Sequence, residues 1–161
     1  HRAHQRVLYE KFLQDITVKE GVSQQLLFPL QLHFNSQEIE VISSLKSDLE
    51  HSGFVFNTVD GDAIEITSIP AVVPEKDITE IFEQIIYNAE HEVPDANFST
   101  ADLLAKSMAK SLAIKTGQSL TNTEQEHLVN SLFACKEPNM SPQNKKTFIT
   151  LSVDDLDKKF V

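Results

Sequence analysis

The sequence predicts an α+β fold, in which helices and strands are mixed along a chain of 161 residues. Several segments place apolar residues at helical spacing. Two short apolar segments, residues 54–56 and 63–67, flank the dipeptide Asp60-Gly61, which is a strong signal for a β-hairpin. This length can form one domain with a substantial core or two small lobes.

The first predicted helix begins at the start of the chain and ends near Gly21. Its buried face is predicted to carry Val7, Leu8, Phe12, Leu13 and Ile16. His1 and Gln5 share another face because they are four residues apart, as are His4 and Leu8. The helix can therefore be a metal-binding helix or a core helix with polar edges. The core interpretation is preferred because a metal site needs several converging ligands.

The next part of the chain, up to residue 98, is predicted to contain the strands. Residues 22–29 are interpreted as an exposed segment, and residues 30–34 alternate as in a half-buried strand. Asn35 or Ser36 caps a helix that ends at Gly53. Its apolar stripe consists of Ile39, Ile42, Leu45 and Leu49. After the hairpin, a helix carries the apolar residues between 78 and 86, and the polar loop 91–98 is the predicted lobe boundary.

The last third is predicted to be mainly helical. One helix runs from Ser99 to about Thr116, with Gly117 as its stop. Residues 121–124 have the form of a capping box that opens the next helix. A loop over 135–146 leads to a strand at 148–151. A final helix, capped by Ser152 and Asp155, ends near residue 160.

The composition excludes several classes of protein. A net charge of −10 argues against a domain that grips DNA by bulk electrostatics, although a modest DNA groove remains open. The lysines on the long helix and near the end are interpreted as solubilising. The single cysteine, Cys135, excludes an internal disulfide and suits a reducing cytosol, and we expect it to be buried as a small apolar residue. No apolar run approaches the roughly 18 residues of a membrane span.

The first helix resembles the C-terminal domain of the MutL family of DNA mismatch-repair proteins. The family pattern is Asp-Gln-His-Ala-x-x-Glu-x-x-x-x-Glu. The matching residues are His1, Ala3, Arg6, Val7, Leu8, Tyr9 and Glu10. Arg2 replaces the alanine and Gln5 replaces the first glutamate. Because the chain starts within this pattern and without methionine, we expect it to be a fragment. Residues 108–115 resemble the family's Ala-Cys-Arg helix, and residues 138–146 lie where nicking members carry Cys-Pro-His-Gly-Arg-Pro.

The resemblance covers nearly the whole chain and implies a two-lobed fold. Residues 1–24 and 100–161 would form an inner dimerisation lobe, and residues 25–99 an outer lobe inserted into it. The expected dimer surface combines apolar faces of the first and last helices with the strand at 148–151. The family's ATPase lies in an N-terminal region outside this chain. Implied partners are a second copy, the replication sliding clamp, MutS and that ATPase region, with DNA bound weakly and no membrane. The implied location is the cytoplasm, at the bacterial nucleoid during repair.

Nicking members of the family hold divalent metals with carboxylate, histidine and cysteine side chains. Most of the matching positions differ here: Ser141 replaces a cysteine, Gln143 a histidine, Lys145 an arginine and Lys110 the helix cysteine. Only His1 and Glu10 remain of the ligands. We therefore predict a domain without nicking activity or cofactor. The alternative is a nicking endonuclease with unusual ligands, holding zinc or manganese at His1 and Glu10. A generic α+β interaction module, independent of the resemblance, is the third hypothesis.

The segment Gln24-Gln25-Leu26-Leu27-Phe28-Pro29 has the form Gln-x-x-Leu-x-Pro. It is similar to the peptide with which MutL proteins engage the sliding clamp. The resemblance therefore implies a clamp-binding role for Gln24, Leu27 and Pro29, in which apolar side chains enter a pocket and the glutamine amide adds hydrogen bonds. In the alternative, the segment is a linker whose three central apolar side chains pack on the outer lobe.

Overall fold

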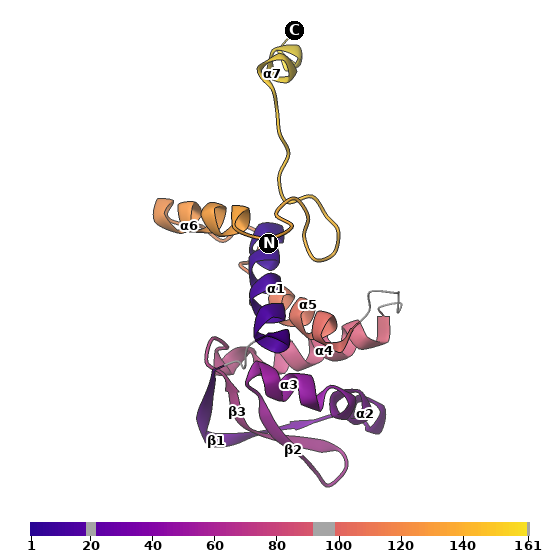
Figure 1. The fold of residues 1–161 in the computed structure, drawn as a ribbon. Coiled ribbons are helices and arrows are strands. Elements are labelled where there is room, and N and C mark those ends of the chain that lie inside the picture. The colour runs from indigo at the N-terminus through magenta and orange to yellow at the C-terminus, as the bar shows by residue number, and fades with distance from the viewer. Residues whose placement is uncertain (19–21, 92–98, 161) are drawn as a thin grey trace.

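The computed structural model describes residues 1–18, 22–91 and 99–160 of the chain (Figure 1). These residues form seven α-helices, one short 3-10 helix and three strands. In chain order they are α1 (Arg2–Thr17), β1 (Ser23–His33), α2 (Ser36–Ser44), α3 (Lys46–Ser52), β2 (Val55–Val59), β3 (Ala63–Pro70), η1 (Glu75–Asp77), α4 (Ile78–His91), α5 (Thr100–Leu112), α6 (Asn122–Phe133) and α7 (Val153–Lys159). The predicted α+β class is confirmed.

The strands form one antiparallel sheet in the order β1-β3-β2. The predicted hairpin joins β2 and β3, and its turn places Asp60 at φ 54° and Gly61 at φ 78°. Positive φ at both central positions suits the right-handed twist of the strands, which explains the Asp-Gly sequence. Phe56 from β2 and the neighbouring Phe54 pack edge-on against Phe82 of α4, with ring centroids 6.2 and 5.4 Å away. The sheet is thereby held against the helices.

The helices α1, α4 and α5 pack together, with α5 in contact with both others (Figure 1). The predicted buried face of α1 is confirmed: Phe12 and Ile16 are buried, and Leu8 and Leu13 pack half-buried against the same cluster. Val7 is half-buried as well. No described helix has the combination of length and apolar character that crossing a membrane requires.

Residues 22–29 are exposed as predicted, apart from the buried Leu26, but the strand predicted to start at residue 30 begins already at Ser23. β1 pairs with β3 over residues 23–25 and again over 30–33, with a bulge between Gln25 and Leu30. Pro29 lies within this bulge, where its missing N–H removes no ladder hydrogen bond. The pairing partners on β3 are thirty or more residues away in the sequence, so no local pattern indicates them.

Two predicted helices differ in extent. The helix over 36–53 is divided at Leu45, where the Ser44 hydroxyl donates to the Val41 carbonyl at 2.7 Å and competes with the helical ladder. The helix predicted to reach Thr116 ends at Leu112. The N–H of Ile114 donates instead to His4 Nδ1 at 2.8 Å, so α1 provides the partner that ends α5.

The predicted strand at 148–151 is absent: these residues belong to no strand, and no described segment pairs with them. An extended segment needs a partner for its backbone groups, and this one projects away from the body of the molecule towards α7 (Figure 1). The predicted caps are confirmed at Asn35, Thr121 and Ser152. The predicted stop at Gly21 and residues 92–98 of the predicted lobe boundary lie outside the described residues.

Candidate functional site

The first helix holds the loop that follows α6 through the buried side chain of Arg6, which is 4% exposed. Its Nε donates to the Met140 carbonyl at 2.6 Å and one terminal nitrogen donates to the Ser141 carbonyl at 3.2 Å. The same nitrogen lies 3.7 Å from the Glu137 carboxylate, and the guanidinium lies 5.1 Å from the Tyr9 ring centroid. Sequence reasoning assigned Arg6 only to the family pattern and missed this role.

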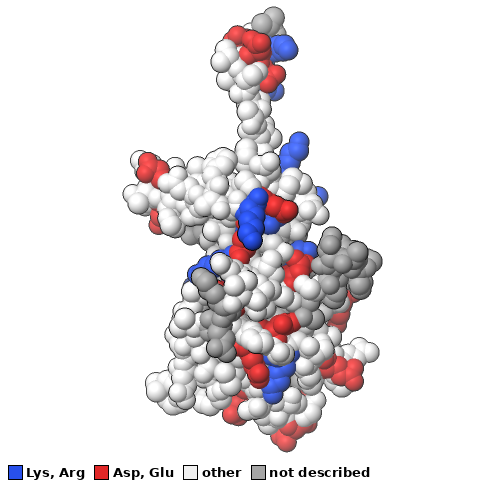
Figure 2. Space-filling view, viewed as in Figure 1, with Lys and Arg blue, Asp and Glu red and all other residues white. Residues whose placement is uncertain are grey.

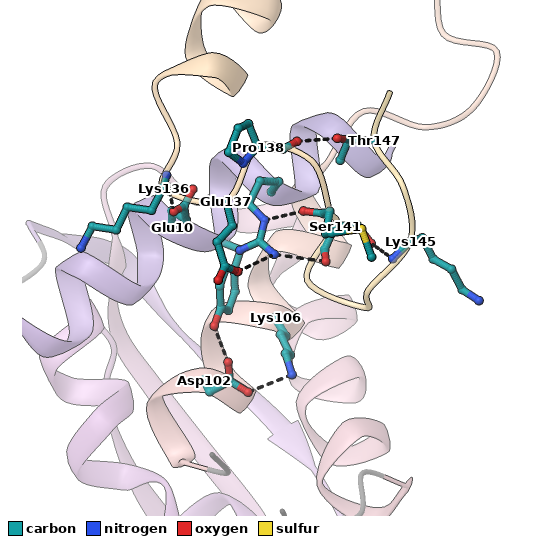
Figure 3. A network of polar contacts seen from close by, with 12 residues as sticks. Glu10, Asp102, Lys106, Lys136, Glu137, Pro138, Ser141, Lys145 and Thr147 are labelled. Carbon is teal, nitrogen blue, oxygen red and sulfur yellow. Dashed lines mark hydrogen bonds and ion pairs between the residues drawn. The ribbon is translucent and has the colours of Figure 1, made fainter. Parts of the chain in front are cut away.

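A second set of polar contacts joins α1 to the start of α5. The Tyr9 hydroxyl donates to Asp102, whose other carboxylate oxygen lies 2.9 Å from Lys106 Nζ (Figure 3). Burial and the hydrogen bond to Asp102 raise the pKa of the Tyr9 phenol above its ordinary value. The phenol therefore remains a proton donor at neutral pH, and the contact with Asp102 links the two helices.

The three late motif positions lie in the loop held by Arg6. Ser141 is buried, and its hydroxyl accepts a hydrogen bond from the Lys145 N–H at 3.1 Å (Figure 3). Its N–H donates to the Lys145 carbonyl at 2.7 Å, which closes a turn in which Asn144 has φ 60°. Gln143 and the Lys145 side chain are exposed. Ser141 thus has a structural role in the turn.

Three of the other predicted positions come together at one cavity. His1, Gln5 and Lys110 line an open cavity of about 490 Å³ where the start of α1 meets the end of α5, with Glu80 and Gln84 of α4 on its other side. The lining offers one imidazole, two neutral amides and the single carboxylate of Glu80, together with the ammonium groups of Lys110 and Lys115. That combination does not suit a divalent cation, because Lys110 repels it.

Glu10 lies elsewhere, towards α6. Its Oε1 accepts a hydrogen bond from the Lys136 N–H at 2.8 Å (Figure 3). Cys135 is half-buried, where we expected it to be fully buried, because it lies at the end of α6 beside a cavity that Glu10 also lines. Burial is the main cause, and interaction with the Glu10 carboxylate the second, that raises the pKa of the Cys135 thiol to about 12.

The donor set does not fit the family's metal centre. Within the ranges that the structure describes, no three His, Cys, Asp or Glu side chains are grouped so that they could hold a metal ion. His1 and Glu10, the two matched ligands, line different cavities. They are nine residues apart at the start of the chain, which separates them by roughly 13 Å along the axis of α1. The two matched ligands therefore do not converge on one metal ion.

The segment similar to a clamp-binding peptide forms the bulged part of β1. Leu26 is buried, whereas Leu27 and Phe28 are 87% and 75% exposed. Pro29 is exposed too. The Gln24 side chain donates to the Val73 carbonyl at 3.3 Å. Of the three central apolar side chains, only Leu26 packs as the linker alternative requires.

The comparison with protein families decides the identity. Residues 1–120 match the model of the MutL C terminal dimerisation domain, which is most of the chain. The chain belongs to the MutL C-terminal dimerisation domain family. The resemblance found in the sequence is thereby confirmed.

Relatives of this MutL-family chain cover almost all of its length. It is 54% identical over 160 residues to the DNA mismatch repair protein MutL of Christiangramia forsetii, covering 99% of this chain and 26% of the relative. It is 54% identical over 159 residues to MutL of Flavobacterium psychrophilum, with the same two coverages. With MutL of Parabacteroides distasonis it shares 34% identity over 160 residues, covering 99% of this chain and 26% of that protein. The chain thus spans about a quarter of the length of these curated relatives.

Proposed function

We propose that this chain joins two copies of a DNA mismatch repair protein into a permanent homodimer and docks other repair proteins onto it. Self-association follows from the name of the family, and the relatives are named DNA mismatch repair proteins. One structural observation carries the choice of surface: α6 and the C-terminal arm, defined as residues 148–160, expose apolar side chains that no other described part of the chain covers.

The exposed apolar side chains of α6 and the C-terminal arm support a dimer surface there. Leu132 is the only buried residue of α6. The exposed members are Val129, Phe133, Phe148, Ile149, Leu151, Val153, Leu156 and Phe160. The Phe133 and Phe148 rings lie 5.2 Å apart, which joins the two elements into one surface. In Figure 2 the stalk that leads to α7 carries no charged groups. A seven-residue helix without packing is not stable in water, so α7 needs a partner surface.

The two-lobed division belongs to the same proposal. Residues 1–24 and 100–161 would form the inner, dimerising lobe, and residues 25–99 the outer lobe. The division is supported by the location of α6 and the C-terminal arm, which both project on the side of the molecule away from the sheet (Figure 1). In the dimer, the backbone groups of the extended segment 148–151 would pair with a strand of the second copy. Such pairing would form the strand that the sequence predicts there.

Sedimentation velocity at micromolar concentration tests the dimer. The double variant Phe133→Ser with Leu156→Ser should weaken the dimer by about 100-fold or more, because apolar anchors dominate interface energies. The matched control replaces two exposed valines outside the proposed surface, Val55→Ser with Val72→Ser, and should remain dimeric. A monomeric parent protein, or equal effects of both double variants, would contradict the proposed surface.

We further propose that the domain does not nick DNA and holds no cofactor. The proposal is supported by the separation of His1 from Glu10 and by the ammonium of Lys110 beside His1. Incubation with supercoiled plasmid and manganese should leave the plasmid intact. Nicking that a Glu10→Ala change abolishes would overturn this and favour the alternative, a metal-dependent endonuclease domain.

Docking of the sliding clamp is proposed for Gln24, Leu27 and Pro29. It is supported by the exposure of Leu27 and by the location of the segment on an edge strand of the sheet. Replacing Gln24 and Leu27 with alanine should abolish pull-down with the clamp and leave the dimer intact. Gln31→Ala, on the same edge strand, is the matched control. Unchanged pull-down by the double variant would refute the assignment.

The whole protein would act through further partners. In this proposal the dimer holds two N-terminal ATPase regions together, so that they can close around DNA after MutS has recruited them in the cytoplasm. The chain itself would contact DNA weakly. Figure 2 supports weak contact, since acidic and basic groups are interspersed on the visible face without a continuous basic surface.

A further inference from the structure

The cavity at the start of α1 has a charge opposite to that of the chain as a whole. Three cationic side chains, Arg2, Lys110 and Lys115, line it, and Glu80 is the only carboxylate among the described residues that do so. Arg2 lies more than one hundred residues from Lys110 and Lys115 in sequence, and the contact between α1 and α5 brings the three together. A local surplus of positive charge on a chain with net charge −10 marks a place where anions are attracted.

The cations of this cavity are available to a ligand. In the described part of the chain no carboxylate pairs with Lys110, whose ammonium lies 5.8 Å from the Tyr87 ring centroid. Arg2 donates from one terminal nitrogen to the Lys146 carbonyl at 3.2 Å, which leaves the remaining N–H groups of its guanidinium. Lys115 lies 3.3 Å from Glu80, but both side chains are more than half exposed. Such a pair contributes little and can exchange for a stronger anion.

The size and the neutral lining suit an oxyanion as well. The cavity has a volume of about 490 Å³. This is far larger than the roughly 30 Å³ that one molecule occupies in liquid water. Gln5 and Gln84 add amide N–H donors at the wall. Gln84 uses one of these for Asn88 at 2.8 Å. Donors of this kind, around a fixed cluster of cations, bind tetrahedral oxyanions without a metal.

We infer that this cavity, defined by Arg2, Lys110 and Lys115, is a binding site for a phosphate group, carried by the DNA backbone or by a free phosphate ligand. The guanidinium of Arg2 can hold two oxygens at once, and the two ammonium groups act as point charges. The site would give the weak DNA contact of the repair dimer a defined location. It does not depend on the dimer surface, which lies on α6 and the C-terminal arm.

Fluorescence anisotropy with a short labelled DNA duplex tests the site. The site variant Arg2→Gln, Lys110→Gln, Lys115→Gln is compared with the control Lys11→Gln, Lys46→Gln, Lys76→Gln, which removes the same charge outside both the cavity and the proposed dimer surface. The site variant should lose about tenfold in affinity, and the slope of log K against log salt should fall by roughly two to three. The control should lose less than about threefold. Glu80→Gln should tighten binding by about threefold, because it removes the one opposing charge.

Titration with inorganic pyrophosphate, followed by calorimetry, separates the two sources of phosphate. Binding of pyrophosphate that is lost in the site variant alone supports the site for a free ligand, and the corresponding loss of duplex binding supports it for DNA. Binding of neither probe by the parent protein, or equal losses in the site and control variants, would overturn the inference. Sedimentation of each variant shows whether the dimer is intact, so a failure of the dimer surface is recognised separately. Lys110→Arg should retain binding.

Discussion

Arg6→Ala is expected to destabilise the fold by about 3 kcal/mol. The substitution removes the hydrogen bonds to the Met140 and Ser141 carbonyls, at 2.6 and 3.2 Å. A hydrogen bond from a charged donor contributes about 1.5–3 kcal/mol. In the variant, water can hydrogen-bond to the two freed carbonyls, which reduces the net loss of stability. The ion pair with Glu137 adds little, since that carboxylate side chain is 76% exposed.

Urea unfolding at one fixed protein concentration measures the effect, because the stability of a dimer depends on concentration. A loss of about 3 kcal/mol corresponds to a midpoint lower by about 1–3 M urea. Glu137→Gln is the matched control and should cost less than about 1 kcal/mol. Arg6→Lys keeps the charge without the planar fork and should fall between the two. The reasoning is refuted if Arg6→Ala destabilises no more than Glu137→Gln.

Three further predictions follow from single contacts. Tyr9→Phe should cost about 1 kcal/mol in urea unfolding, because it removes the hydrogen bond to Asp102, which keeps its ion pair. Gly53→Ala should lower the melting temperature, with a cost of about 1–2 kcal/mol, because Gly53 has φ 115° and a Cβ would lie 3.1 Å from the backbone of β3. The pKa of Cys135 is raised to about 12, so the unfolded thiol ionises first and stability should fall as the pH rises from about 9 to 12.

Each of these has an outcome that would count against it. A Tyr9→Phe variant as stable as the parent would mean that the contact with Asp102 contributes nothing. A Gly53→Ala variant of equal or higher melting temperature would contradict the strained turn. The Cys135→Ser variant has no thiol to ionise, so its stability should fall less than that of the parent between about pH 9 and 12. Identical pH profiles of the two proteins would show that the thiol is not responsible.

The features that the sequence predicted correctly are local. The capping boxes at Asn35, Thr121 and Ser152 each involve residues three positions apart, so the whole interaction lies within a short stretch of sequence. The Asp60-Gly61 turn is equally local. The apolar stripe of α1 was predictable because its spacing reflects the geometry of one helix.

The features that the sequence missed depend on distant partners. β1 extends back to Ser23 because β3 pairs with it, and α5 ends early because His4 accepts the next hydrogen bond. The strand predicted at 148–151 lacks any partner in the described parts of this one chain. Its residues have strand propensity, but pairing decides whether a strand forms.

The sequence by itself determined where most helices begin, the hairpin, the buried face of α1 and the resemblance to the MutL C-terminal domain. Only the tertiary structure decided where the motif residues lie: His1 and Lys110 at one cavity, Glu10 at another, and Ser141 in a turn under Arg6. Arg6 and Met140 are 134 positions apart. Contacts over such distances arise from the packing of whole helices, and residue spacing does not encode them.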